Sequence, residues 1–221
     1  MGIRKLKKIK AINIVLTVLV ISLVTLTLTT YMLIKGVMRS LSTDSDIKEI
    51  EIVDAMKDYD YVLTETDTEL FKKLFYELKD LLEKTNKSTD FEEKYAKLVA
   101  QLFVVDFYDL DSKINKNDVG GVQFVYESYR ESFRSYASDI TGIYYYIENN
   151  TYGDREQKLP IVEDVEITSI TVIAFEHEEF KDDNAFLIAI SIKYKEDLGY
   201  DKTVELVLAH NNKKIEVVEM R

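Results

Sequence analysis

The chain has 221 residues and contains no cysteine, no tryptophan, one proline and seven glycines. The absence of cysteine excludes disulfide bridges, thiolate metal ligands, a cysteine nucleophile and a lipid-modified cysteine. Gly-rich phosphate loops and nucleophile-elbow motifs are also missing from the sequence. What remains is 46% hydrophobic and 31% charged, which is typical of a folded domain. We therefore expect no cofactor and no enzymatic activity.

Acidic residues are missing from the first 39 positions, which divides the chain by charge. Residues 1–10 carry five basic side chains, and residues 11–34 then run for 24 positions without a charge. At about 1.5 Å of rise per residue, such a helix covers a hydrocarbon core of about 30 Å. We predict a cytoplasmic stub at 1–10, a transmembrane anchor at 11–35 and a linker at 36–58.

The charges around the predicted span also indicate its orientation. Five basic residues precede it and only Lys35 and Arg39 follow closely, so we expect a single-pass protein of the cell membrane whose N-terminus is cytoplasmic and whose C-terminal domain is extracytoplasmic. A cleaved signal peptide is the alternative, but its apolar stretch is shorter, roughly 7–15 residues, and ends at a small-x-small site. Here the run ends in Tyr31-Met-Leu-Ile34, which favours an uncleaved anchor.

The predicted extracytoplasmic part is strongly acidic. The whole chain has a net charge of −11, and the first 39 residues hold seven basic and no acidic side chains, so residues 40–221 carry −18. Phosphates are repelled by such a surface, which excludes nucleic acid as a partner. We expect protein partners or self-association instead.

The hydrophobic period changes from helical to strand-like along the chain. Apolar residues at three- and four-residue spacing predict helices after caps at Thr68 and at Thr89 or Asp90, and a longer third helix. Later segments alternate with a period of two and have short polar connections, which indicates an antiparallel meander. The predicted elements are a strand at 59–64, a helix from Glu69 to the Asn86-Lys-Ser-Thr-Asp stretch, a second helix from its cap to Tyr108, a third helix at 122–148, a polar loop at 109–121 ending in Gly120-Gly121, and strands at 165–175, 186–194, 204–208 and 215–217.

We therefore predict an α+β domain over residues 59–221, with helices packed on one face of a curved four-stranded antiparallel sheet. One face of the first long strand carries Val165, Ile167, Thr171, Ile173 and Phe175. The opposite face of the sheet is apolar as well, so we expect it to be curved or partly covered. The residues predicted on that second face are Ile170, Val172, Leu187, Ala189 and Val207.

A membrane anchor, then helices, then a curved four-stranded meander resembles the cystatin-like or NTF2-like cone fold. Together with the inside-facing N-terminus, the order of elements over about residues 60–221 is similar to VirB8-like subunits of bacterial secretion and conjugation machines. The resemblance implies a non-enzymatic extracytoplasmic domain that self-associates and contacts other subunits. It implies no particular site residue, because it depends on architecture and not on a motif.

Four residues near the predicted end of the third helix are candidates for binding a small ligand: Tyr144, Tyr145, Asp154 and Arg155. Asp154 and Arg155 follow this helix, where the helix end and the mouth of the sheet meet in cone folds. The alternative is a structural use, with Arg155 bridging the connector to an acid or Asp154 capping a turn. Tyr144, Tyr145 and Tyr146 cannot share one helix face, because successive residues are about 100° apart. At least one of these tyrosine rings is therefore expected to be exposed, as tyrosines at protein interfaces are.

Two other groups contain residue types that bind metals, and we predict no metal at either. The acidic loop residues Asp109, Asp111, Asn115, Asn117 and Asp118 do not follow the spacing of a calcium loop, so a helix cap and turn is the simpler interpretation. His177 is followed by Glu178 and Glu179 but lacks a metal-binding spacing.

Two hypotheses about function follow. The first is a non-enzymatic, membrane-anchored interaction or assembly domain of a secretion or conjugation machine. The second is a small-ligand-binding or weakly catalytic domain with an NTF2-like pocket. A deep pocket with converging polar groups such as Arg155 and Asp154 would favour the second.

Overall fold

The computed structural model describes residues 50–84, 88–151, 153–178 and 180–221. The predicted stub, the anchor at 11–35 and most of the linker lie outside these residues, as does Glu179. Among the described helices, none has the length and apolarity needed to cross a membrane. The anchor therefore stays a prediction.

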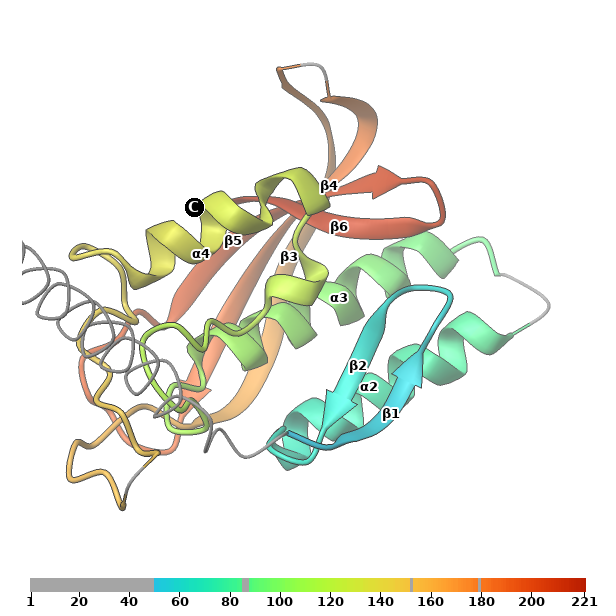
Figure 1. Ribbon diagram of the computed structural model, residues 1–221. Coiled ribbons are helices and arrows are strands. Elements are labelled where there is room, and N and C mark those ends of the chain that lie inside the picture. The colour runs from blue at the N-terminus through green and yellow to red at the C-terminus, as the bar shows by residue number, and fades with distance from the viewer. Residues whose placement is uncertain (1–49, 85–87, 152, 179) are drawn as a thin grey trace, which may run out of the picture. The chain divides into compact units, whose positions relative to one another are not determined.

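The described chain is an α+β domain of helices packed on a four-stranded antiparallel sheet, as predicted (Figure 1). A hairpin of β1 (Ile52–Met56) and β2 (Tyr61–Thr64) comes first and forms a separate two-stranded sheet. Strand β1 lies within the segment that the sequence indicated as a linker. The remaining elements are α2 (Glu69–Glu83), α3 (Phe91–Tyr108), η1 (Val122–Phe124), η2 (Glu127–Tyr129), α4 (Arg130–Ser138), β3 (Val162–His177), β4 (Phe180–Tyr194), β5 (Thr203–Asn211) and β6 (Lys214–Met220).

Helix α2 has one apolar face, and its start is defined by a side-chain cap. The hydroxyl of Thr68 accepts a hydrogen bond from the Phe71 amide at 3.2 Å, which satisfies one of the free N–H groups of the first turn. The buried residues of α2 recur at helical spacing and pack on α3: Phe71, Leu74, Phe75, Leu78 and Leu81. The cap and the apolar period therefore both confirm the predicted helix.

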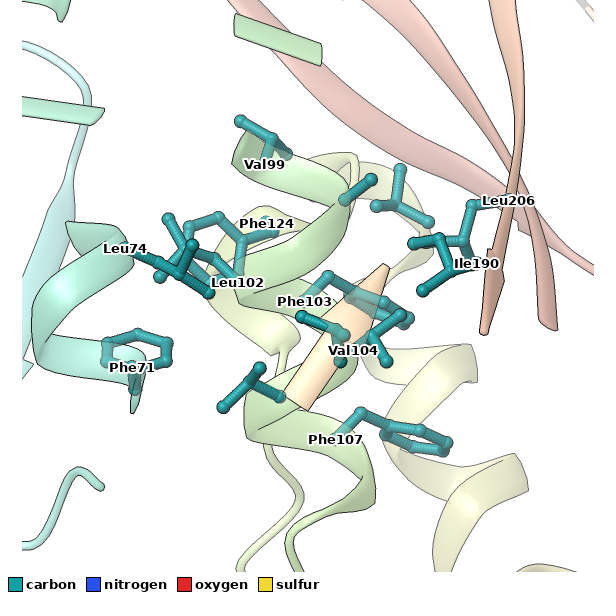
Figure 2. Close-up of a cluster of buried hydrophobic side chains, with 14 of the residues drawn as sticks. Phe71, Leu74, Val99, Leu102, Phe103, Val104, Phe107, Phe124, Ile190 and Leu206 are labelled. Atoms are coloured by element: carbon teal, nitrogen blue, oxygen red, sulfur yellow. The ribbon is translucent and has the colours of Figure 1, made fainter. Parts of the chain in front are cut away.

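Helix α3 is the centre of the core, because it contacts α2 and all four strands of the large sheet. Its side chains are buried on more than one face, as expected for a helix covered on several sides. Figure 2 shows Phe103, Val104 and Phe107 of α3 between Phe71 of α2 and Ile190 of the sheet. The aromatic ring of Phe133 in α4 lies 5.6 Å from that of Phe103, so α4 packs on the same helix.

The predicted third helix at 122–148 is wrong. The Val125 backbone is extended and forms a parallel bridge with Val217 of β6, so the first residues of this segment pair with the sheet edge. Helix α4 then ends at Ser138, and the chain turns back over it. The Tyr144 amide donates to the Ala137 carbonyl at 3.1 Å, and a Cβ on Gly142 would lie 2.1 Å from the same oxygen. Glycine permits this close approach, which ends the helix.

The four strands of the large sheet follow the chain order β3-β4-β5-β6. Their predicted succession is confirmed, but one predicted face is wrong for half of β3. The register shifts between Ile167 and Ser169, and such a bulge exchanges the two faces of the strand beyond it. Val165, Ile167 and Ile170 pack in the main core, whereas Ile173 and Phe175 belong to a separate cluster on the other face.

The second face of the sheet is partly covered, as its apolar residues suggested. A small buried cluster there contains Phe175, Ala185, Val207 and Ala209. The β3–β4 hairpin extends beyond the other strands in Figure 1 and contributes Phe175 and Ala185 to this cluster. Its far end reaches the η2 segment, where the Tyr129 hydroxyl and His177 Nδ1 are 3.0 Å apart.

We expect Ile188→Ala to lower the free energy of unfolding by about 3 kcal/mol, because Ile188 is fully buried in strand β4 and its truncation leaves a cavity. The same change at Ile52, which is 60% exposed in β1, is expected to cost less than about 1 kcal/mol. Urea unfolding followed by circular dichroism measures both. Equal losses at the two positions would contradict this assignment of the core.

Candidate functional site

A small polar cavity lies under the loop of residues 109–121 and has a volume of about 160 Å³. It is bounded by the β1–β2 hairpin, the start of α2, the end of α3 and the loop itself. Its floor is apolar, and its walls carry hydroxyl, carboxylate and ammonium groups. The polar side chains that line it are Thr64, Thr66, Asp67, Thr68, Asp106, Asp109, Ser112, Lys113, Asp118 and Gln123.

The centre of this cavity wall is an ion pair between Asp106 of α3 and Lys113 of the loop. The Lys113 ammonium donates to Asp106 Oδ1, and both side chains are largely buried. Asp106 Oδ2 accepts the Gly121 amide at 2.6 Å. Burial is the largest single effect on the pKa of Lys113 and lowers it. The charge and hydrogen bond of Asp106, together with the nearby Tyr144 and Asp118, outweigh burial, so the pKa is raised. Both oxygens of Asp106 therefore hold the loop to α3.

The two glycines at the end of the loop are required by this close packing. A Cβ on Gly120 would lie 2.1 Å from the Asp106 carbonyl oxygen, so no larger residue fits there. Gly121 has a φ of +75° and lies against the ring of Phe103, a conformation that favours glycine. The Gly120-Gly121 break predicted from the sequence is thus confirmed, and its cause is contact with α3.

Asp109 begins the loop and is buried. Its carboxylate accepts the Val162 amide at 2.9 Å and the Ser112 amide at 3.3 Å. Burial raises the pKa of the Asp109 carboxyl, and these two amides oppose the shift without cancelling it. Asp109 therefore joins the end of α3 to the start of β3.

Two of the four predicted ligand-binding residues fasten the same loop. The Arg155 guanidinium donates to the backbone carbonyls of Ile114 at 3.0 Å, Glu148 at 3.2 Å and Leu110 at 3.5 Å, and also to that of Lys113. The buried Tyr144 hydroxyl accepts the Gly120 amide at 3.1 Å and donates to the Phe107 carbonyl at 2.7 Å. Neither side chain lines the cavity, so both act on the loop backbone.

The other two predicted residues lie at the surface. Asp154 is exposed, and Tyr145 is half-buried beside Lys116, whose ammonium lies 5.0 Å from the ring centre. The structure therefore does not bring Asp154, Arg155, Tyr144 and Tyr145 together around one pocket. Of the three consecutive tyrosines, Tyr146 is 70% exposed, which confirms that at least one ring faces solvent.

The acidic loop residues and the two histidines form hydrogen bonds within the domain. Asn115 Oδ1 accepts the Asn117 amide at 2.8 Å, and Asp118 Oδ2 accepts the Ile114 amide at 2.9 Å, which confirms a turn. His177 bonds to Tyr129, whereas His210 Nδ1 lies 2.8 Å from Asp182 Oδ2. Within the described part of the chain, no three His, Asp or Glu side chains form a group suited to a metal ion.

A second hollow, which we name the α4 groove, lies between α4, strand β6 and the end of β3, and has a volume of about 450 Å³. Its α4 side is a stripe at helical spacing that includes Phe133 and Tyr136, and Tyr136 is 63% exposed. The residues lining the groove are Val125, Tyr129, Ser132, Phe133, Tyr136, Phe175, His177, Val217, Val218, Glu219 and Met220. The sequence did not indicate this groove, because the pattern predicted one longer helix over 122–148.

The two hollows differ in what they can do chemically. Among the described residues, His210 Nε2 is the one buried side-chain nitrogen or oxygen without a hydrogen-bond partner, and it does not line the polar cavity. The buried polar groups of that cavity are thus already satisfied by the protein. The α4 groove is mainly apolar, so covering its exposed side chains with another apolar surface is energetically favourable.

Comparisons with family models, curated proteins and solved structures find no match to this chain.

We expect Arg155→Gln to lower the free energy of unfolding by about 1–3 kcal/mol, because it removes the guanidinium that satisfies several loop carbonyls. Amide hydrogen exchange in residues 110–121 should become faster. The neighbouring change Asp154→Asn is the control and should alter the stability by less than about 0.5 kcal/mol, because Asp154 is exposed. A loop that exchanges at the parental rate in Arg155→Gln would disprove the fastening role.

The raised pKa of Asp109 predicts a pH dependence. The folded state binds the Asp109 proton more tightly than the unfolded state does. The stability that this group contributes is therefore complete below the unfolded pKa of about 3.9 and is lost as the pH rises through the folded pKa. We expect Asp109→Asn to flatten this loss in urea unfolding measured from pH 3 upward, and Asp154→Asn to leave it unchanged. A parental profile in Asp109→Asn would contradict the shift.

Proposed function

We propose that the chain is a membrane-anchored, non-enzymatic domain that binds other proteins outside the cytoplasm. The observation that carries this proposal is the α4 groove, an apolar hollow of about 450 Å³ with the exposed Tyr136 ring at its wall. Exposed apolar hollows edged by aromatic residues are typical of protein interfaces. The predicted anchor at 11–35 would attach this domain to the membrane.

The fold gives the proposal further support. Helices followed by an antiparallel meander, with the β3–β4 hairpin extending past its neighbours, agree with a cystatin-like or NTF2-like cone. We propose the chain as such a domain, similar in order of elements to VirB8-like subunits, and thus as a component of a secretion or conjugation machine. Its acidic surface fits partners that carry positive charge.

A small-ligand-binding function is the second candidate, and the polar cavity is the observation that favours it. Its carboxylates at Asp67 and Asp109 have raised pKa values, mainly because both are buried, and such groups gather at functional sites. The cavity holds only about 160 Å³, below the usual 300–1,000 Å³ of ligand pockets. Its buried groups also bond to the protein itself, so we favour the interaction domain.

The proposal predicts crosslinking from the groove in intact cells. With p-benzoylphenylalanine in place of Tyr136, the full-length chain should form a discrete crosslinked product, because that side chain faces the groove. The same replacement at Tyr146, which is similarly exposed but outside the groove, is the matched control and should give much less product. If the chain stays an uncrosslinked monomer from Tyr136 and from every other surface position tried, the proposed function is wrong.

A further inference from the structure

The outer edge of strand β6 is open beside the α4 groove. The Tyr126 amide donates to the Val217 carbonyl at 2.9 Å, and after this bond the chain leaves the edge and enters α4. Arg221 and Glu205 exchange backbone hydrogen bonds of 2.9 and 3.2 Å on the inner side. Because backbone groups alternate along a strand, the N–H and C=O of Met220 point to the outer side. No described residue makes a backbone hydrogen bond to Met220 there.

The α4 groove lies next to this edge and adjoins a second hollow. Tyr129, Phe133 and Tyr136 form one wall, and Val218 and Met220 lie opposite. A further hollow of about 560 Å³ shares Tyr129 and His177 with the groove and continues past the β3–β4 hairpin. The two hollows together exceed what one side chain fills, which favours a segment of several residues.

The charges around the groove are mainly negative. The bounding segments 127–136, 175–178 and 217–221 hold five acidic and three basic residues, for a net charge of −2. Glu131 and Glu219 are paired with arginines of the same segments, so the attraction comes from Glu127, Glu176 and Glu178. Residues 50–221 as a whole carry −16, since residues 40–49 account for −2 of the −18 given above. A second copy of this domain would therefore be repelled, whereas a basic segment would be attracted.

We propose that the α4 groove binds an extended segment of a partner protein in which apolar residues alternate with lysine or arginine. The segment pairs its backbone with Met220, places its apolar side chains between α4 and β6, and directs its basic side chains toward the surrounding glutamates. An extended chain fits better than a helix, because a helix has already bonded its own backbone groups and cannot pair with a strand edge. This inference rests on the proposed function and specifies the partner.

The test is a binding titration with a defined probe. A fluorescein-labelled synthetic peptide of about ten residues that alternates valine and lysine is titrated with the full-length chain in a non-ionic detergent, and anisotropy is followed. We expect saturable binding. A valine–glutamate peptide should bind at least about tenfold more weakly because of the acidic surroundings. Two further versions of the valine–lysine peptide carry N-methyl groups on alternate residues, one on the valines and one on the lysines. One of them should bind about tenfold more weakly, because its N-methyl groups block the backbone edge that pairs with Met220.

Two protein variants locate the binding. Tyr136→Ala removes an apolar wall of the groove and should weaken binding by about fivefold or more, whereas Tyr146→Ala should change it by less than about twofold. The inference is overturned if the glutamate peptide binds equally well, if neither N-methylated version weakens, or if Tyr136→Ala binds like the parent. It is also overturned if the crosslink from position 136 maps to a second copy of this chain or to a helical segment. In those cases a crosslink in cells would still support the proposed function, so the two proposals fail separately.

Discussion

The burial of helix α3 is the interaction on which the rest of the domain depends. This helix contacts all four strands of the large sheet on one side and α2 on another, and α4 reaches it through Phe133. A buried leucine or phenylalanine contributes about 1.5–3 kcal/mol through removal from water, and α3 carries many such residues. Each other layer is apolar on the side that faces α3, so the helix determines where they all lie.

The same helix also accounts for the polar region of the domain. Asp106, in the last turn of α3, bonds both Lys113 and the Gly121 amide, so a charged pair is buried at the edge of an apolar core. Removal of one partner from such a pair leaves an unpaired charge, which is strongly destabilising. Arg155 and Tyr144, which do not line the cavity, also form hydrogen bonds with the loop backbone. This cluster of charged residues therefore holds the loop to α3.

Local patterns predicted the elements that depend on local forces. The apolar period and the Thr68 cap located α2, and alternation located the strands of the meander. The segment 122–148 failed, because its extended part at Val125 is stabilised by Val217, about ninety residues away in the chain. The bulge after Ile167 is equally invisible in the alternation, since it shows only against β4. A structural use of Arg155 was expected from the sequence, but its partners were not. They are backbone carbonyls rather than an acid, and carbonyls carry no residue signature.

The bulge in β3 divides the strand into two halves that pack in different clusters. Before it, Val165 and Ile167 face the helices. Beyond it, Ile173 and Phe175 face the other way, and Phe175 lines the α4 groove. Substitutions in the far half of β3 can therefore reshape the α4 groove while the packing around α3 is left intact.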